Sequence, residues 1–249
     1  MSTKQVSTVV LSALCLVVSA SCVAQTREEV AIMTSPPGRP STQLWLVQSQ
    51  AKHLVLDGGY QGRLIGLEEL TELESVTITF STASDWAALP EMPLVKRVTV
   101  SKAQLPGLDA LYVFPNMGQL IVTNTVITEA QPRLDLSRLP SLAFADLSFS
   151  RIAQLPEISN VASGSLTYLN LEGSRIAAGS AEAIDALSSI PTVSLARNSI
   201  MESESLQIPE RLGSEIRDIP PEFQGYYNLR ELYSLEEIAR ISGSNAREP

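Results

Sequence analysis

The sequence repeats one pattern of apolar residues between positions 51 and 200, with a period of about 22 to 25 positions. Seven windows fit a template with apolar residues at positions 1, 4, 6 and 11 and a small or polar residue at position 9. Of the 28 apolar slots, 27 hold Ala, Val, Ile, Leu or Met, whereas about 12 would be expected from a hydrophobic content of 44%. A repeat of this length predicts units that bury their apolar faces only by stacking on their neighbours. The windows begin at Ala51, Leu73, Val95, Met117, Leu142, Leu166 and Ile190.

The repeat resembles the leucine-rich-repeat family throughout residues 51–200. The clearest units are residues 166–176 (LTYLNLEGSRI) and 190–200 (IPTVSLARNSI), which match the family template Leu-x-x-Leu-x-Leu-x-x-Asn-x-Leu. The resemblance implies an α/β repeat fold, a solenoid with a curved parallel β-sheet on its concave face and short helices, 3₁₀ turns or extended segments on its convex face. The Asn slot departs from the family, so we expect fewer side-chain bonds between turns and a softer solenoid. That slot holds Gly59, Ser81, Ala103, Thr125, Ser150, Ser174 and Asn198.

The two ends of the repeat array are expected to be capped. We place the solenoid at residues 44–209, with an N-terminal cap strand over residues 44–47 (LWLV). Residues 210–249 look like a degenerate repeat followed by a helix, because apolar residues keep helical spacing across residues 228–241. We interpret this helix as a C-terminal cap; the alternative is a partner-binding helix.

Residues 1–24 have the features of a secretory signal peptide. A single cation, Lys4, precedes an apolar stretch over residues 9–18 and then small residues. The segment 18–22 (VSASC) resembles a bacterial lipoprotein box, which implies lipid attachment at Cys22. The alternative is cleavage after Ala24, which would release a secreted protein. We therefore expect export across the inner membrane, to the cell envelope as an outer-membrane lipoprotein or into the medium.

Residues 25–43 are predicted to be a flexible linker, because residues 36–40 read PPGRP and Ser and Thr follow them. Both cysteines, Cys15 and Cys22, lie before this linker, so disulfide bonds within the repeat array are not expected.

On the concave face, we expect the side chains at positions 3, 5, 7 and 8 of each unit to form columns across the strands. Units five and six set aromatic rings beside acidic and amide groups, which is typical of a protein-binding surface. The alternative is that the two rings are an exposed cross-strand pair without a partner. The predicted contact patch is Phe144, Asp146, Tyr168, Asn170 and Glu172, with Arg97, Lys102 and Arg197 at its margins.

Composition favours binding over catalysis. One His and two Cys leave little material for metal sites or Cys-His dyads, so we expect no metal and no cofactor. The lone His53 is predicted to lie about 13 Å along its strand from Asp57, too far for a catalytic triad. The alternative to a binding role is a hydrolase, carbohydrate or calcium site centred on Asp146 and Glu172.

Charge narrows the class of partner. The net charge of −9 argues against nucleic acid and against anionic membranes, except through an N-terminal lipid. We therefore predict a monomeric, non-catalytic scaffold that binds a basic or mixed-charge protein.

Overall fold

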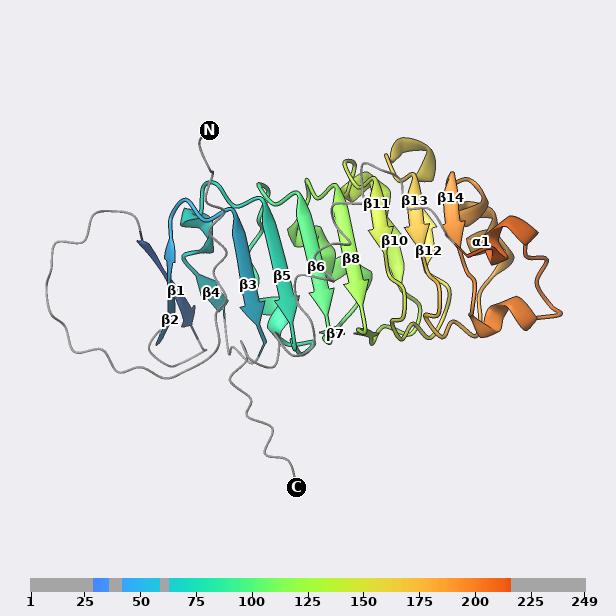
Figure 1. Cartoon of the computed structure of the whole chain (residues 1–249), viewed down its shortest axis with the longest axis horizontal. Helices are drawn as coiled ribbons and strands as arrows, with labels where there is room; N and C mark the ends of the chain where they lie inside the picture. The colour runs from blue at the N-terminus through green and yellow to red at the C-terminus, as the bar shows by residue number, and fades with distance from the viewer. Residues whose placement is uncertain (1–28, 36–41, 59–62, 216–249) are drawn as a thin grey trace, which may run out of the picture.

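The computed structural model of the chain describes residues 29–35, 42–58 and 63–215. These residues form an α/β fold with few helices, in which seven parallel strands lie side by side in the order of the chain (Figure 1). Each strand pairs only with the strands that precede and follow it in this series. The strands are β3 (His53–Asp57), β5 (Ser75–Thr79), β6 (Arg97–Ser101), β8 (Gln119–Thr123), β11 (Phe144–Asp146), β13 (Tyr168–Asn170) and β14 (Thr192–Ser194).

The seven strands coincide with the seven predicted windows. Every strand begins at position 3 of its unit, and equal positions pair across the sheet, as Leu54 does with Val76. Alternate side chains on a strand point to opposite faces, so positions 4 and 6 reach the same side. The residues at these two positions are buried in all seven units, which confirms the predicted core. We call the opposite side, which bears positions 3, 5 and 7, the outer face of the sheet.

Backbone hydrogen bonds link consecutive units at the same two places, and each of the two arrangements occurs at five of the six junctions. At position 2, one carbonyl accepts two N–H groups of the next unit, as Lys52 O does from Glu74 N and Ser75 N (2.8 and 2.9 Å). At position 8, the N–H donates to the position-7 carbonyl of the next unit, as Lys102 N does to Thr123 O (3.3 Å). These bonds hold the units in register beyond the ends of the strands.

Position 8 turns the chain out of the sheet through the left-handed region of backbone conformation. Six of the seven units have a φ between 51° and 64° there, although only one of the six residues is glycine. This conformation costs a non-glycine residue about 1–2 kcal/mol, and least for Asn. The repeated turn therefore stores a small strain at each unit. The residues are Phe80, Lys102, Asn124, Phe149, Gly173 and Arg197.

The N-terminal end of the array is covered by a separate antiparallel sheet. Its order is β2 (Thr42–Gln48), β1 (Glu29–Ser35) and β4 (Arg63–Ile65), and β1 pairs with both of its neighbours. Val30, Ile32 and Val47 from this sheet are buried in the main core. The predicted cap strand at 44–47 is thus confirmed as part of β2.

The prediction of a flexible linker over residues 25–43 was wrong for residues 29–35. Val30 and Ile32 stand two residues apart and bury one face of β1, which is the alternation expected of a strand. The Pro- and Gly-rich segment 36–40 lies outside the described residues, between β1 and β2 in the chain.

The return segments of the units carry short strands and turns. Two pairs of short parallel strands follow the main sheet, β7 (Gln104–Leu105) with β9 (Val126–Ile127), and β10 (Arg133–Asp135) with β12 (Glu157–Ser159). Among the described residues, the one α-helix is α1 (Ala181–Ser188), capped by Ser180 Oγ, which accepts from Ala183 N. The 3₁₀ turns are η1 (Leu67–Glu69), η2 (Asp85–Ala88), η3 (Leu108–Val113), η4 (Leu136–Arg138), η5 (Val161–Ser163), η6 (Ser199–Glu202) and η7 (Glu210–Gly213).

Side chains at position 9 bond the preceding unit only toward the C-terminal end of the described array. Ser150 Oγ donates to Val122 O (3.1 Å), and Ser174 Oγ donates to Leu147 O (2.7 Å). Asn198 Nδ2 donates to Leu171 O (2.7 Å) while its Oδ1 accepts from Ile176 N. Ser81 Oγ, in contrast, is buried and finds no hydrogen-bond partner among the described residues. The side-chain ladder is therefore uneven, as the departures from Asn predicted.

The described chain ends against the last strand. Leu195 N donates to Leu212 O (2.6 Å), and Leu212 in η7 is fully buried. The C-terminal end of the core is thus covered by residues of 210–215. The predicted signal peptide (1–24) and the predicted helix (228–241) lie outside the described residues.

The strained turn at position 8 predicts a stability order for substitutions at exposed Lys102. Lys102→Asn should be about 0.5 kcal/mol more stable than Lys102→Gln, because Asn tolerates the left-handed region better. Lys102→Val should be at least about 1 kcal/mol less stable than Lys102→Gln, since a β-branched residue is poorly accommodated there. Urea unfolding measures the free energies, and the Gln variant controls for loss of the charge. Equal stability of the Val and Gln variants would contradict the strain.

Candidate protein-binding surface

The outer face of the sheet carries ordered rows of side chains, one row for each odd position. Strand pairing places equal positions side by side, so each row crosses all seven strands. The position-3 row changes from polar residues on β3 to β8 to aromatic residues on β11 and β13. In order, it holds His53, Ser75, Arg97, Gln119, Phe144, Tyr168 and Thr192.

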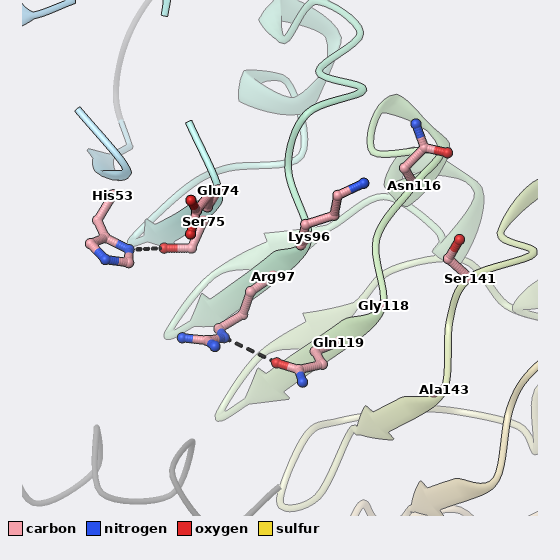
Figure 2. Close-up of a pocket in the computed structure, with 10 residues that line it drawn as sticks. All are labelled: His53, Glu74, Ser75, Lys96, Arg97, Asn116, Gly118, Gln119, Ser141 and Ala143. Carbon is pink, nitrogen blue, oxygen red and sulfur yellow. Dashed lines mark hydrogen bonds between the residues drawn. The ribbon is translucent and has the colours of Figure 1, made fainter. Parts of the chain in front are cut away.

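Neighbours in the polar part of this row are hydrogen-bonded in pairs. His53 Nδ1 and Ser75 Oγ lie 2.5 Å apart, and Arg97 Nε donates to Gln119 Oε1 at 3.0 Å. Figure 2 shows both pairs, with the four side chains following one another across β3, β5, β6 and β8. All four are half-buried, so their polar edges reach solvent. The repeat register predicted these residues on this face, but it did not predict the contact between His53 and Ser75.

A shallow depression of about 330 Å³ lies along this row, at the start of the strands (Figure 2). Its charged lining consists of Lys96, Arg97 and Glu74. Glu74 is paired with Lys52 at 2.8 Å, so its charge is already balanced outside the depression. Hydrogen-bond donors and positive charge therefore dominate the local surface, although the whole chain is acidic. The other lining residues are His53, Ser75, Asn116, Gly118, Gln119, Ser141 and Ala143.

His53 is held in its neutral form at pH 7. Burial lowers its pKa below the usual 6.5, and the neighbouring Arg97 cation lowers the pKa further. A neutral imidazole can accept or donate a hydrogen bond without adding charge to the surface. Within the described chain, no carboxylate forms a hydrogen bond to His53, because Asp57 accepts from Thr79 and Glu74 binds Lys52.

The position-5 row changes at β11, and the change ends the strands early. Asp146 Oδ1 accepts from Ser148 N (2.9 Å), Asn170 Oδ1 from Glu172 N (3.0 Å), and Ser194 Oγ from Ala196 N (3.2 Å). A side chain that accepts the N–H two residues later forms a turn that competes with strand pairing. This explains why β11, β13 and β14 have three residues, whereas the first four strands have five. The side-chain oxygens of Asp146 and Asn170 therefore accept hydrogen bonds from the backbone of their own turns.

The aromatic pair predicted for the contact patch is present but buried. Phe144 and Tyr168 stack with their ring centroids 4.4 Å apart and an angle of 13° between the planes. Phe144 is 0% exposed, Tyr168 1% and Asp146 0%. The expectation that these side chains stand in solvent was therefore wrong. The alternation of a strand predicts which face a side chain occupies but does not predict what covers that face.

The charged residues of the predicted patch lie at its edge. Arg197 binds Glu172 Oε1 through Nη1 (3.2 Å) and Glu215 Oε1 through Nη2 (2.8 Å). Lys102 lies over the ring of Phe80, with Nζ 5.6 Å from the centroid. Arg97, as described above, contacts Gln119. The structure therefore groups Arg197 with Glu172 and separates Lys102 and Arg97 from them.

Asp146 and Glu172, the centre of the alternative site, do not form an open site among the described residues. The Asp146 carboxylate is fully buried on its own turn, and Glu172 is ion-paired. Among the described residues, no three side chains of His, Cys, Asp or Glu gather closely enough to hold a metal ion. The same residues include no helix with the length and apolar character needed to cross a bilayer.

No family model matches the chain, and the search of curated proteins gave no match.

The environment of His53 predicts its titration. The only histidine of the chain should titrate below 6.5 in an NMR experiment, and Arg97→Gln should raise its pKa by removing the nearby cation. Because the folded pKa is lowered, the unfolded chain binds the proton first. Stability should thus fall as the pH drops through about 6.5.

Arg133→Gln is the matched control, because Arg133 pairs with Glu157 on the return segments and should leave the His53 titration unchanged. A wild-type pKa at or above 6.5 would contradict the assignment of a buried imidazole beside a cation.

Proposed function

We propose that this chain is an exported leucine-rich-repeat solenoid that binds a partner protein through the concave side of its first four units. The repeat template and the pairing of each strand with the strand of the next unit support the solenoid architecture. In a solenoid of this kind, the outer face defined above is the concave face, which is where extended binding surfaces form.

The observation that carries the binding proposal is the half-exposed polar surface on β3, β5, β6 and β8. Hydroxyl, amide, imidazole and guanidinium groups lie there in rows, and rigid strands fix their positions. Position 5 adds Val55, Thr77 and Thr99, whose side chains are also half-buried. Such a surface supplies many oriented hydrogen bonds to a second polar surface.

The depression beside Arg97 indicates one feature of the partner. Two cations and several N–H donors line it, so it suits an acidic side chain or another anionic group projecting from the partner. The net charge of −9 disfavours a partner that is acidic overall. We therefore propose a partner of mixed or basic character that places an acidic group in this depression, beside exposed Lys96.

A binding role suits the contacts of His53 better than a catalytic one. Catalysis by a Ser–His pair requires a third group that orients the imidazole. Within the described chain, the adjacent carboxylate, Glu74, is directed to Lys52, so His53 and Ser75 form a pair without an orienting acid.

Site-specific photocrosslinking tests the binding surface. A photoreactive amino acid at Thr99, on the proposed surface, should give a discrete protein adduct in cells that carry this gene. The same group at exposed Glu69 in η1 is the control and should not give that adduct. Arg97→Glu should weaken the crosslinked complex by about tenfold or more, as expected for a central interface arginine. Identical adducts from both positions, or full binding by Arg97→Glu, would refute the proposed surface.

Export and anchoring are proposed from residues 1–24, which lie outside the described residues. Cys22 is proposed as the lipid attachment point of a cell-envelope lipoprotein. Labelled palmitate should enter the wild-type protein, and globomycin should block its processing. Cys22→Ser should lose the label, whereas Cys15→Ser, within the apolar stretch, should keep it. A mature protein that begins with unmodified Gln25 would instead establish secretion.

A further inference from the structure

The turns that leave the main sheet lie along one edge of the molecule, at the carboxyl ends of the parallel strands (Figure 1). From the second unit to the seventh, the side chains at positions 8 and 10 point away from the core, whereas position 9 between them is buried. Gln104 pairs with Val126, and Val126 pairs with Arg151, so position 10 continues from unit to unit. We call positions 8 and 10 of units two to seven the turn edge.

Two exposed aromatic rings stand on the turn edge. Phe80 is 49% exposed and Phe149 is 48% exposed. Both residues have a left-handed backbone, with φ of 51° and 55°, which a bulky residue adopts only with strain. Asn124 and Gly173 hold the same position in the units on either side of Phe149, and these two residue types adopt the left-handed region readily. The turn therefore does not require phenylalanine, and a half-exposed ring adds little to the core.

The next unit along the chain holds each ring in place. Lys102 Nζ lies 5.6 Å from the centroid of the Phe80 ring. The Phe149 ring lies against the backbone of Gly173, where an added Cβ would stand 2.9 Å from two ring carbons. A side chain at position 173 would therefore displace this ring. Both rings are thus oriented by contacts with the protein while a large part of their surface reaches solvent.

The turn edge is basic although the chain is acidic. Positions 8 to 11 of the seven units contain four cations and no Asp or Glu, whereas acidic residues outnumber basic ones by 27 to 18 in the whole chain. Arg197 is paired with Glu172 and Glu215. The other three cations form no ion pair with any described residue, and they are Lys102, Arg151 and Arg175.

We propose that the turn edge docks on the surface of an anionic lipid bilayer. Phe80 and Phe149 enter the interface between headgroups and acyl chains, and the cations lie against anionic headgroups. Exposed apolar rings beside Lys and Arg are the composition of interfacial membrane-binding segments. This proposal goes beyond the proposed function and does not rest on it, because it needs neither the partner protein nor a lipid at Cys22.

The separation of the two rings favours a bilayer over a protein partner. Phe80 and Phe149 belong to units three strands apart, which is about 14 Å at the usual strand spacing, and Lys102 and Asn124 stand between them. A protein partner would need two separate pockets at that spacing, whereas the interface of a fluid bilayer accommodates separated side chains. A small soluble anion could not contact both rings. The depression described above lies at the opposite ends of the strands, so docking of the turn edge leaves it open.

The net charge of −9 does not prevent this contact. Exposed charges are largely screened beyond about 8 Å at physiological ionic strength, so acidic groups remote from the turn edge act weakly on a bilayer that the edge touches. Each Lys or Arg near an anionic bilayer adds a favourable interaction. The charge of the edge, rather than that of the whole chain, therefore determines whether the edge docks.

An environment-sensitive fluorophore on the turn edge tests the proposal in the full chain. Cys15→Ser and Cys22→Ser first remove the native thiols, so that no lipid can be attached. A fluorophore on Gln104→Cys, in a unit between the two rings, should become at least about threefold brighter with phosphatidylcholine vesicles that contain about 30% phosphatidylglycerol. Vesicles of phosphatidylcholine alone should give a much weaker response. The same fluorophore on Ser141→Cys, which is exposed near the starts of the strands, should not respond.

Substitutions in the same labelled chain identify the groups that bind. Phe80→Asn with Phe149→Asn should lower the vesicle affinity by about tenfold or more, because it removes both rings and leaves residues that suit the left-handed turn. Leu94→Asn is the matched control, since Leu94 is 50% exposed just before β6, at the opposite edge, and should leave the affinity unchanged. Arg151→Gln with Arg175→Gln should also weaken binding by about tenfold, and only to vesicles that contain phosphatidylglycerol.

Five results would overturn the proposal. Three of them are the lack of a response at Gln104→Cys, an equal response at Ser141→Cys, and an affinity that survives the loss of both rings. The fourth is brightening by sn-glycerol 3-phosphate without vesicles, which would assign the edge to a soluble anion. The fifth is a discrete protein adduct from a photoreactive group at Gln104 in cells, without any vesicle response, which would assign the edge to a protein. Phe80→Asn alone repeats the test if the double variant alters the β-sheet circular dichroism.

Discussion

The hydrogen bonds between the backbones of consecutive units determine the geometry of everything else in this molecule. At five of the six junctions a position-2 carbonyl accepts two N–H groups of the next unit, and at five of the six a position-8 N–H donates to the next unit's position-7 carbonyl. Side chains are not needed for either bond, so the register survives although the length of the unit varies along the chain. Because the register is fixed, equal positions form rows across the strands. Each unit contributes one side chain to each row, so the sequence of the unit determines the chemistry of the row at that strand.

Two substitutions along these columns divide the outer face into regions of different character. Position 5 changes from Ile121 to Asp146, and position 3 changes from Gln119 to Phe144, between the same two strands. The first change shortens the strands, because the carboxylate accepts an N–H that a ladder would otherwise use. The second replaces a hydrogen-bonded polar row with stacked rings. The polar half suits an external surface, whereas the aromatic half gains stability only when it is covered.

The sequence alone predicts the strands and the core well, because both depend on alternation along a strand. Leu54 and Leu56 are buried because they stand at positions 4 and 6 of their unit, as Leu169 and Leu171 do in theirs. The same alternation recurs in all seven units. The strand over residues 29–35 was missed because its alternation is short and a Pro-rich segment follows it. The turns made by Asp146 and Asn170 could have been found, since Asp and Asn side chains often accept the backbone N–H two residues later. The burial of Phe144 depends on contacts between residues remote in the sequence, such as its stacking on Tyr168, which no local pattern encodes.

The order of the strands has a consequence for synthesis. Each strand of the main sheet pairs only with strands of the adjacent units, so a unit can join the sheet as soon as it and the preceding unit are free to fold. The N-terminal sheet is different, because β1 completes its pairing only when β4 has been made, after both β2 and β3. Formation of the N-terminal sheet therefore requires contacts between residues farther apart in the chain than those that join neighbouring strands of the main sheet. The last strand, β14, needs only β13 as its neighbour in the sheet, so it can pair once the preceding strands have formed.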